Sequence, residues 1–160
     1  MATLPQIIEE DLGEMNAALR ELLTKSEATL GFILDKGGFV VTQYGEAPEF
    51  DVMTLAALGA ASFAATESIA GLLGERNFSS VYQQGDLYSV MVMNIDEFCL
   101  LTVIFRANLS AGAIKYYATD TIRRVAMQLQ LAQTRAPGQG LDLSMANLAD
   151  PSVLFKRSSA

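Results

Sequence analysis

The chain has 160 residues, enough for one domain with a substantial hydrophobic core, and a net charge of −7. It contains no histidine and one cysteine, Cys99, which excludes a disulfide framework within the chain and the usual zinc clusters of histidine and cysteine. The acidic balance offers no basic surface for a nucleic acid. We therefore expect a cytoplasmic protein that holds no metal or cofactor and binds neither DNA nor RNA.

The N-terminal segment MATLPQIIEEDLGEM predicts a helix rather than a secretory signal, because it has consecutive acids and no basic residue. Thr3 and Gln6 have the spacing of a capping box, and Pro5 is tolerated in a first helical turn. The apolar positions at helical spacing are Leu4, Ile8, Leu12, Met15, Leu19 and Leu22. The pattern predicts one amphipathic helix whose first turn includes Pro5.

Five strands are expected along the chain. Residues 29–44 form two β-rich runs around Asp35-Lys36-Gly37-Gly38, where glycine can supply the positive φ of a tight hairpin turn. Three further runs, at 78–84, 87–94 and 98–105, are separated by short polar connections. The last run is apolar on both alternating faces, which predicts a central strand covered on both sides.

Two more helices are expected. Asp51 is placed to cap a middle helix that Gly74 would close, and Ser110 is placed to cap a long final helix. The linker APGQG ends the final pattern. We therefore expect one domain over residues 1–134 and a flexible C-terminal tail over residues 135–160. Because the last strand needs cover on both faces, the fold class is predicted to be an α/β sandwich of three layers, α-β-α, with a mainly antiparallel sheet of five strands.

The middle helix has an unusual composition, since Leu55 to Gly74 contains mostly small residues and a single charge, Glu67. It is long enough to span a membrane, but its charge, hydroxyl groups and glycines favour a helix that is not inserted. At 100° per residue the helix divides into three stripes. A mixed stripe contains Ala56, Ala60, Phe63, Glu67 and Ala70. A bulky stripe, expected to pack on the sheet, contains Leu55, Leu58, Ser62, Ala65, Ile69 and Leu72. A small stripe contains Ala57, Ala61, Ala64, Ser68 and Gly71.

The small stripe predicts contact with another polypeptide, because small side chains at this spacing let two helix backbones approach closely. The alternative is that it faces a loop or water, since alanine is also the best helix former. The segment FSSVYQQ has no charge or proline and is expected to be an edge strand, and unprotected edges pair. Its candidate pairing residues are Phe78, Ser79, Ser80, Val81 and Tyr82. Two copies could join such edges and set their small stripes side by side, which predicts a homodimer. FVVTQY at 39–44 is equally uncharged, so the residues alone leave open which edge pairs.

The sequence offers little for catalysis. Cys99 lies in the predicted central strand, where its thiol would be hard to ionise and inert. There is no Gly-rich phosphate loop, so the chain is not expected to bind a nucleotide or a small-molecule substrate by itself. Arg76 could act as an arginine finger, but a cation at a helix end is also favoured by the helix dipole. We therefore expect no catalytic, cofactor-binding or metal-binding residue and no enzyme activity.

Several segments together resemble the Roadblock/dynein light chain family over residues 3–132. These segments are TLGFILDKGG, the stretch from Leu55 through LLGE, and VIFRANLSAGAIK. DKGG at 35–38, GE at 74–75 and an apolar LFK in the tail are similar to the bacterial MglB-like members, the partners of the Ras-like small GTPase MglA. The resemblance implies a sheet with the middle helix on one face and the two terminal helices on the other. It also implies a dimer that continues the sheet through residues 78–84.

The resemblance also implies a function. In MglB-like proteins the paired middle helices form the platform for the GTPase, and the matching positions here are the small stripe. Val153, Leu154 and Phe155 are candidate second anchors, although Pro151 and the basic KRSSA ending depart from the acidic C-terminal helix of MglB-like chains. The resulting hypothesis is a homodimeric, noncatalytic regulator that binds a Ras-like small GTPase and stimulates its GTP hydrolysis. The alternatives are a Roadblock-like scaffold or adaptor subunit of a motor, filament or signalling complex, and a ligand sensor.

Overall fold

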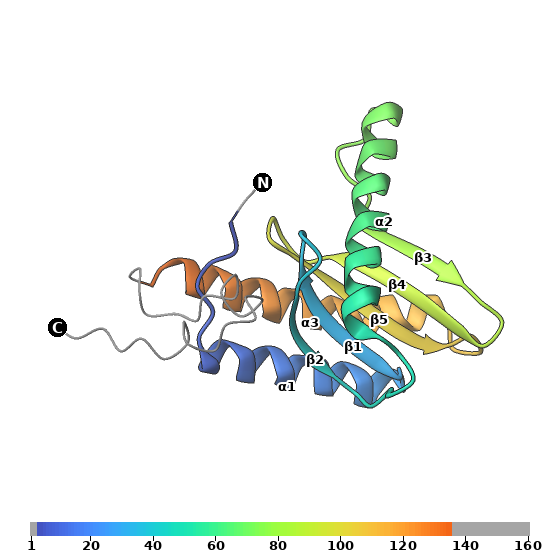
Figure 1. Ribbon diagram of the computed structural model, residues 1–160, viewed down its shortest axis with the longest axis horizontal. Coiled ribbons are helices and arrows are strands. Elements are labelled where there is room, and N and C mark those ends of the chain that lie inside the picture. The colour runs from blue at the N-terminus through green and yellow to red at the C-terminus, as the bar shows by residue number, and fades with distance from the viewer. Residues whose placement is uncertain (1–2, 136–160) are drawn as a thin grey trace.

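The computed structural model describes residues 3–135, in which three helices accompany one sheet of five antiparallel strands (Figure 1). The elements in chain order are α1 (Glu9–Ser26), β1 (Leu30–Asp35), β2 (Val40–Tyr44), α2 (Val52–Leu73), β3 (Ser80–Gln84), β4 (Tyr88–Asn94), β5 (Cys99–Arg106) and α3 (Ala111–Gln133). The strand order is β2-β1-β5-β4-β3, so β2 and β3 are the two edges.

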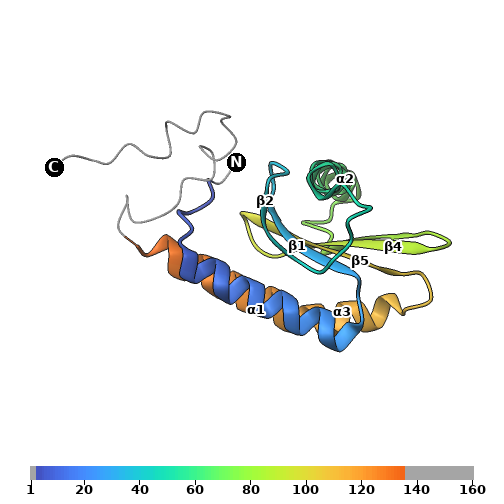
Figure 2. The ribbon, with the colours of Figure 1, turned by 60° about the horizontal axis from the view of Figure 1, so that its bottom comes forward.

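The elements form three layers. Figure 2 shows α2 alone on one face of the sheet, with α1 and α3 side by side on the other. Each face has its own buried apolar cluster, one between the sheet and the α1–α3 pair and the other beneath α2. The predicted three-layer sandwich is therefore confirmed.

The central strand β5 is buried on both faces from Cys99 to Phe105, as its uninterrupted apolar run predicts. It pairs with β1 on one side and β4 on the other. Burial raises the pKa of the Cys99 thiol well above its ordinary value, because the thiolate would lose its hydration. The thiol is therefore un-ionised at neutral pH, in agreement with an inert role.

The start of α1 differs from the expectation. The helix begins at Glu9, and Thr3 and Pro5 precede it. The carboxylate of Asp11 accepts a hydrogen bond of 2.9 Å from the Ile8 N–H, so it supplies the return half of a capping box that the sequence pattern assigned to Gln6. The prediction was wrong because Asp11 accepts a hydrogen bond from the backbone N–H of Ile8 at this later position, where three acids in the first turn also suit the helix dipole.

The other predicted helix ends and the hairpin are confirmed. Gly38 has a φ of +94° in the β1–β2 turn, and Gly74 ends α2 with a φ of +73°. The Asp51 side chain accepts a 3.2 Å hydrogen bond from the Thr54 N–H at the start of α2. The Ser110 hydroxyl accepts one of 3.3 Å from the Ala113 N–H at the start of α3. Each cap satisfies backbone groups that lack a partner within the helix.

A buried polar cluster joins the start of α1 to the end of α3. Asp11 is fully buried, and its carboxylate accepts a 2.6 Å hydrogen bond from the Gln128 amide and two hydrogen bonds from the Arg135 guanidinium. Burial alone would raise the pKa of Asp11, but hydrogen bonds from Arg135, Ile8 and Gln128 outweigh it, so the pKa is lowered. Arg135 is the first residue of the predicted tail, and the rest of that tail lies outside the described residues.

Candidate partner-binding surface

The face that α2 presents to the sheet differs from the expectation. Its buried residues are Ala56, Ala60, Phe63 and Ala70, which all belong to the mixed stripe. Within the bulky stripe, Leu55 is half-buried against the core, whereas Leu58 is 63% exposed and Leu72 is 88% exposed. The prediction that the bulky stripe packs on the sheet was therefore wrong for Leu58 and Leu72.

The reason is that most of the large side chains in the interface between α2 and the sheet come from the sheet. Under α2 the strands present large buried side chains, and the cluster they form contains Leu30, Phe32, Leu34, Val92, Leu100 and Ile104. Alanines on the helix let it lie close to these side chains, and Phe63 is the one large side chain of α2 that is buried. Gly59 lies over the sheet as well, since an added Cβ would be in ordinary van der Waals contact, at 3.7 Å, with both the Thr102 hydroxyl oxygen and a methyl carbon of Val92.

The small stripe is exposed along the whole length of α2. It lies on the flank that faces the β1–β2 turn, because Gly38 of that turn touches Ala57 and Lys36 faces Glu67 at 3.9 Å. At Gly71 an added Cβ would meet no atom within 4 Å. The positions that the resemblance assigns to a GTPase are therefore free within the described part of the chain.

Sequence reasoning missed a second exposed group, which we term the apolar crest. It consists of Leu58, Ile69 and Leu72, which point away from the sheet and are at least half exposed. Figure 1 shows that the second half of α2 projects beyond the sheet. An exposed apolar face of this kind is typical of interaction sites. The projection at 100° per residue separates these residues from the small stripe, but it does not say which stripe meets the sheet.

The edge strand β3 is open for pairing. Of the predicted pairing residues, Phe78 and Ser79 precede the strand, and Ser80, Val81 and Tyr82 lie within it. The Asn94 N–H donates a 3.0 Å hydrogen bond to the Ser79 carbonyl, and residues along an antiparallel ladder alternate between bonding to the neighbour and pointing away. The backbone groups of Ser80 and Tyr82 therefore point to the outer edge, where no strand of residues 3–135 pairs with them.

The small stripe and β3 lie on opposite flanks of α2. The small stripe faces the β1–β2 turn, whereas β3 is at the far end of the strand order from β2. Gly59, on the flank opposite Ala57, lies above β4 and β5. A second copy joined at β3 and a partner on the small stripe would therefore approach α2 from different sides. The expectation that a dimer joined at this edge sets the two small stripes side by side was wrong, because the edge and the stripe lie on opposite flanks of the helix.

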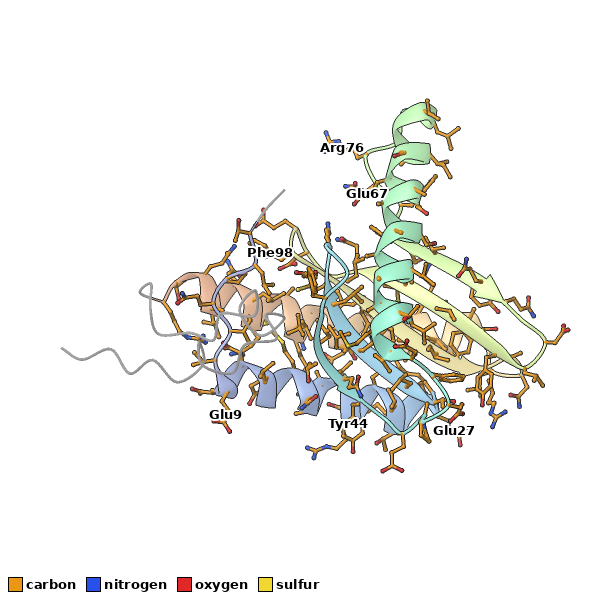
Figure 3. The ribbon with its side chains drawn as sticks, in the orientation of Figure 1. Glu9, Glu27, Tyr44, Glu67, Arg76 and Phe98 are labelled. Atoms are coloured by element: carbon orange, nitrogen blue, oxygen red, sulfur yellow. The ribbon has the colours of Figure 1, made fainter. Side chains whose placement is uncertain are left out.

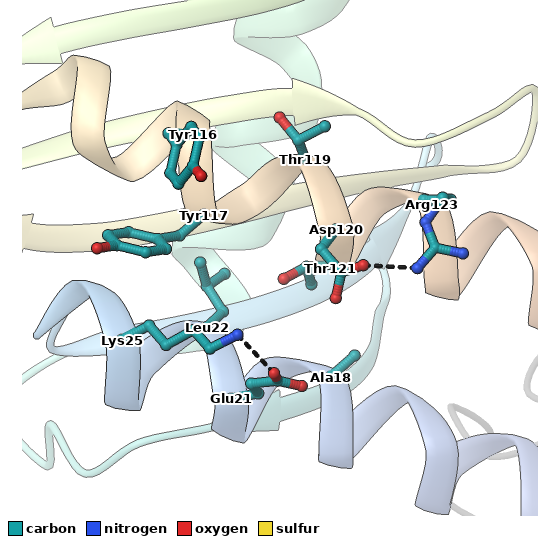
Figure 4. Close-up of a pocket in the computed structure, with 10 residues that line it drawn as sticks. All are labelled: Ala18, Glu21, Leu22, Lys25, Tyr116, Tyr117, Thr119, Asp120, Thr121 and Arg123. Carbon is teal, nitrogen blue, oxygen red and sulfur yellow. Dashed lines mark hydrogen bonds and ion pairs between the residues drawn. The ribbon is translucent and has the colours of Figure 1, made fainter.

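The opposite face of the molecule carries an open groove of about 460 Å³ between α1 and α3 (Figure 4). Its charged rim is paired within the chain, by Lys25 with Glu21 at 2.7 Å and by Arg123 with Asp120 at 2.6 Å. These pairs leave few free charges to hold a polar ligand, so the groove gives the ligand-sensor alternative little support. No group of three or more acidic or cysteine side chains among residues 3–135 is arranged to hold a metal ion.

Two further features bear on the surface. Helix α2 is long and apolar enough to cross a membrane by length and composition, and here it packs on the sheet through Ala56, Ala60 and Phe63. Arg76, just past α2, is exposed and lies on the same side of the helix as Glu67 (Figure 3). It makes no ion pair with another residue of the described range. Val153, Leu154 and Phe155 lie outside the described residues.

Comparison with models of known protein families identifies the family of this chain. The model of the Roadblock/LC7 domain matches residues 15–105, which is more than half of the chain. The chain belongs to the Roadblock/LC7 family. The match includes the whole of α2, strands β1 to β4 and all but the last residue of β5, so both β3 and the exposed face of α2 are parts of the Roadblock/LC7 domain.

Solved structures similar to this Roadblock/LC7 protein include MglB proteins. An MglB with a tetrameric arrangement is 26% identical, with a TM-score of 0.76 over 82% of this chain and 99% of that one. The gliding protein MglB of Thermus thermophilus is 25% identical, with a TM-score of 0.74 over 82% and 99%. Myxococcus xanthus MglB is 24% identical, with a TM-score of 0.75 over 81% and 98%. A search of curated proteins gave no match.

Proposed function

We propose that this Roadblock/LC7 protein is a homodimeric, noncatalytic regulator that binds a Ras-like small GTPase of the MglA type in the cytoplasm and stimulates its GTP hydrolysis. The observation that carries the proposal is the uncovered apolar face of α2, formed by the small stripe and the apolar crest. The similarity to MglB structures over almost their whole length supports the GTPase as the partner.

The dimer would form through β3. Two β3 edges related by a twofold axis would pair through the outward backbone groups of Ser80 and Tyr82 and continue the sheet. The flank of α2 above β3 would then face the second copy, and half-buried Ser62 and Thr66 lie on that flank. The small stripe, on the other flank, would stay free in the dimer for the GTPase.

Stimulation would come from the surface rather than from a donated side chain. The one cysteine of the chain is buried, and Arg76, the candidate arginine finger, lies just past the C-terminal end of α2, where a cation suits the helix dipole. A rigid platform can instead hold the switch segments of the GTPase in their hydrolytic arrangement. The caps at Asp51 and Gly74 hold both ends of α2, so the platform is suited to this role.

The test is GTP turnover by an MglA-type GTPase from the same organism, with and without the full chain. We expect the wild type to accelerate turnover, and Ala64→Arg to abolish both binding and acceleration, because the long cation would occupy the small stripe. Ala113→Arg is the matched control, since Ala113 is an exposed helical alanine on the opposite face. Binding without acceleration would favour the scaffold or adaptor alternative, and neither binding nor acceleration would refute the proposal.

A further inference from the structure

Helix α2 carries one charged side chain, Glu67, and this carboxylate faces a cationic side chain from another element. Lys36 reaches it from the β1–β2 turn, with 3.9 Å between the ammonium nitrogen and a carboxylate oxygen. Figure 3 places Glu67 on the side of α2 that faces this turn. The pair therefore stands at the border between the turn and the small stripe, next to a face that is otherwise uncharged.

This ion pair is loose compared with the two pairs that border the groove between α1 and α3. Its 3.9 Å separation is beyond hydrogen-bond distance, whereas Lys25–Glu21 is 2.7 Å and Arg123–Asp120 is 2.6 Å. The side chains of Lys36 and Glu67 are 25% and 42% exposed, and neither makes a hydrogen bond to another residue of the described range. A pair of this kind contributes little to folding, so both charges are available to other partners.

We propose that Lys36 and Glu67 determine specificity at the α2 surface, by exchanging their mutual contact for contacts with an acidic and a basic group of the bound GTPase. The inference rests on the function proposed above. An apolar face supplies affinity but little orientation, because burial of apolar area is non-directional. Opposite charges at its border fix the register of the partner and exclude partners with the wrong signs.

The double variant Lys36→Glu/Glu67→Lys tests the inference, because it keeps the intramolecular pair and reverses the charges offered to a partner. Binding to an MglA-type GTPase loaded with a non-hydrolysable GTP analogue is measured by calorimetry. Each single reversal should weaken binding about ten-fold, and the double variant should weaken it about a hundred-fold, because the two effects add at separate partner contacts. Restoration of wild-type affinity in the double variant would overturn the inference, since the pair would then act only within the chain.

The controls separate this inference from folding and from the proposed function. Asp120→Arg/Arg123→Asp reverses a pair on the opposite face and should bind like the wild type. The neutral variant Lys36→Met/Glu67→Gln should keep the wild-type melting temperature and still bind about ten-fold more weakly, because both partner contacts lose their charge assistance. If Ala64→Arg abolishes binding and the charge reversal does not, only the specificity inference fails. If the wild type does not bind, the proposed function fails first.

Discussion

Gly38 in the β1–β2 turn lies directly against Ala57 of α2: a Cβ built on Gly38 would be 3.0 Å from the Ala57 Cα. The turn and the helix are more than a dozen residues apart in the chain, and this contact fixes the turn beside the small stripe. Gly38 also has a φ of +94°, which an L side chain rarely adopts. Both its conformation and its surroundings therefore require glycine.

We expect Gly38→Ala to lower the free energy of unfolding by about 2 kcal/mol, because it adds backbone strain to a clash with rigid helix backbone. Gly13→Ala is the matched control, since Gly13 lies within α1 with nothing within 4 Å of an added Cβ. That change should stabilise the chain by about 1 kcal/mol through helix propensity. Urea unfolding of both variants measures the difference, and a Gly38→Ala variant as stable as the wild type would contradict the contact.

The sequence predicted those parts of the fold that local chemistry determines. Asp51, Ser110 and Gly74 mark helix ends because caps are made by neighbouring groups, and the doubly apolar run of β5 can only be a central strand. The start of α1 was missed because two overlapping capping patterns compete, and the one that includes Asp11 is reinforced by Gln128 and Arg135 from far along the chain.

The site was predicted less completely, for a physical reason. Stripes on α2 can be drawn from residue spacing, but the stripe that meets the sheet depends on the bulk of the strands beneath it. Large sheet residues such as Phe32 and Ile104 favour alanine above them, which turns Leu58 and Leu72 outward. A helix with few large residues gives no strong periodic signal. The face of α2 that turns toward the sheet is therefore determined only by packing against the assembled strands.

Asp11→Asn should lower the free energy of unfolding by about 2 kcal/mol at neutral pH. The substitution removes the buried negative charge that pairs with the Arg135 guanidinium. Water offsets part of this loss, because the Arg135 side chain is 22% exposed and can be hydrated. Thermal or chemical unfolding measures the change. The matched control is Asp120→Asn, which removes the charge from an exposed pair and should leave stability nearly unchanged, because solvent screens such pairs.

The same carboxylate predicts a dependence of stability on pH. The pKa of Asp11 is lowered from 3.8, so the folded state binds its proton less readily than the unfolded state. The stabilisation is therefore fully present above pH 3.8 and is lost as the pH falls through the lower, folded-state pKa. Unfolding between about pH 2 and 5 should show a steeper acid loss for the wild type than for Asp11→Asn, and parallel curves would refute the linkage.

Ser80→Pro should separate the proposed dimerisation from folding. Its N–H points to the outer edge of β3, so proline removes a donor that no other described strand uses and leaves the ladder to β4 intact. We expect a folded monomer by light scattering, with a melting temperature that no longer depends on protein concentration. Val81→Pro is the contrasting variant, because Val81 bonds to β4 and its loss should unfold the edge. If Ser80→Pro remains a dimer of wild-type stability, β3 is not the joined edge and pairing must use another surface, of which β2 is the first to test.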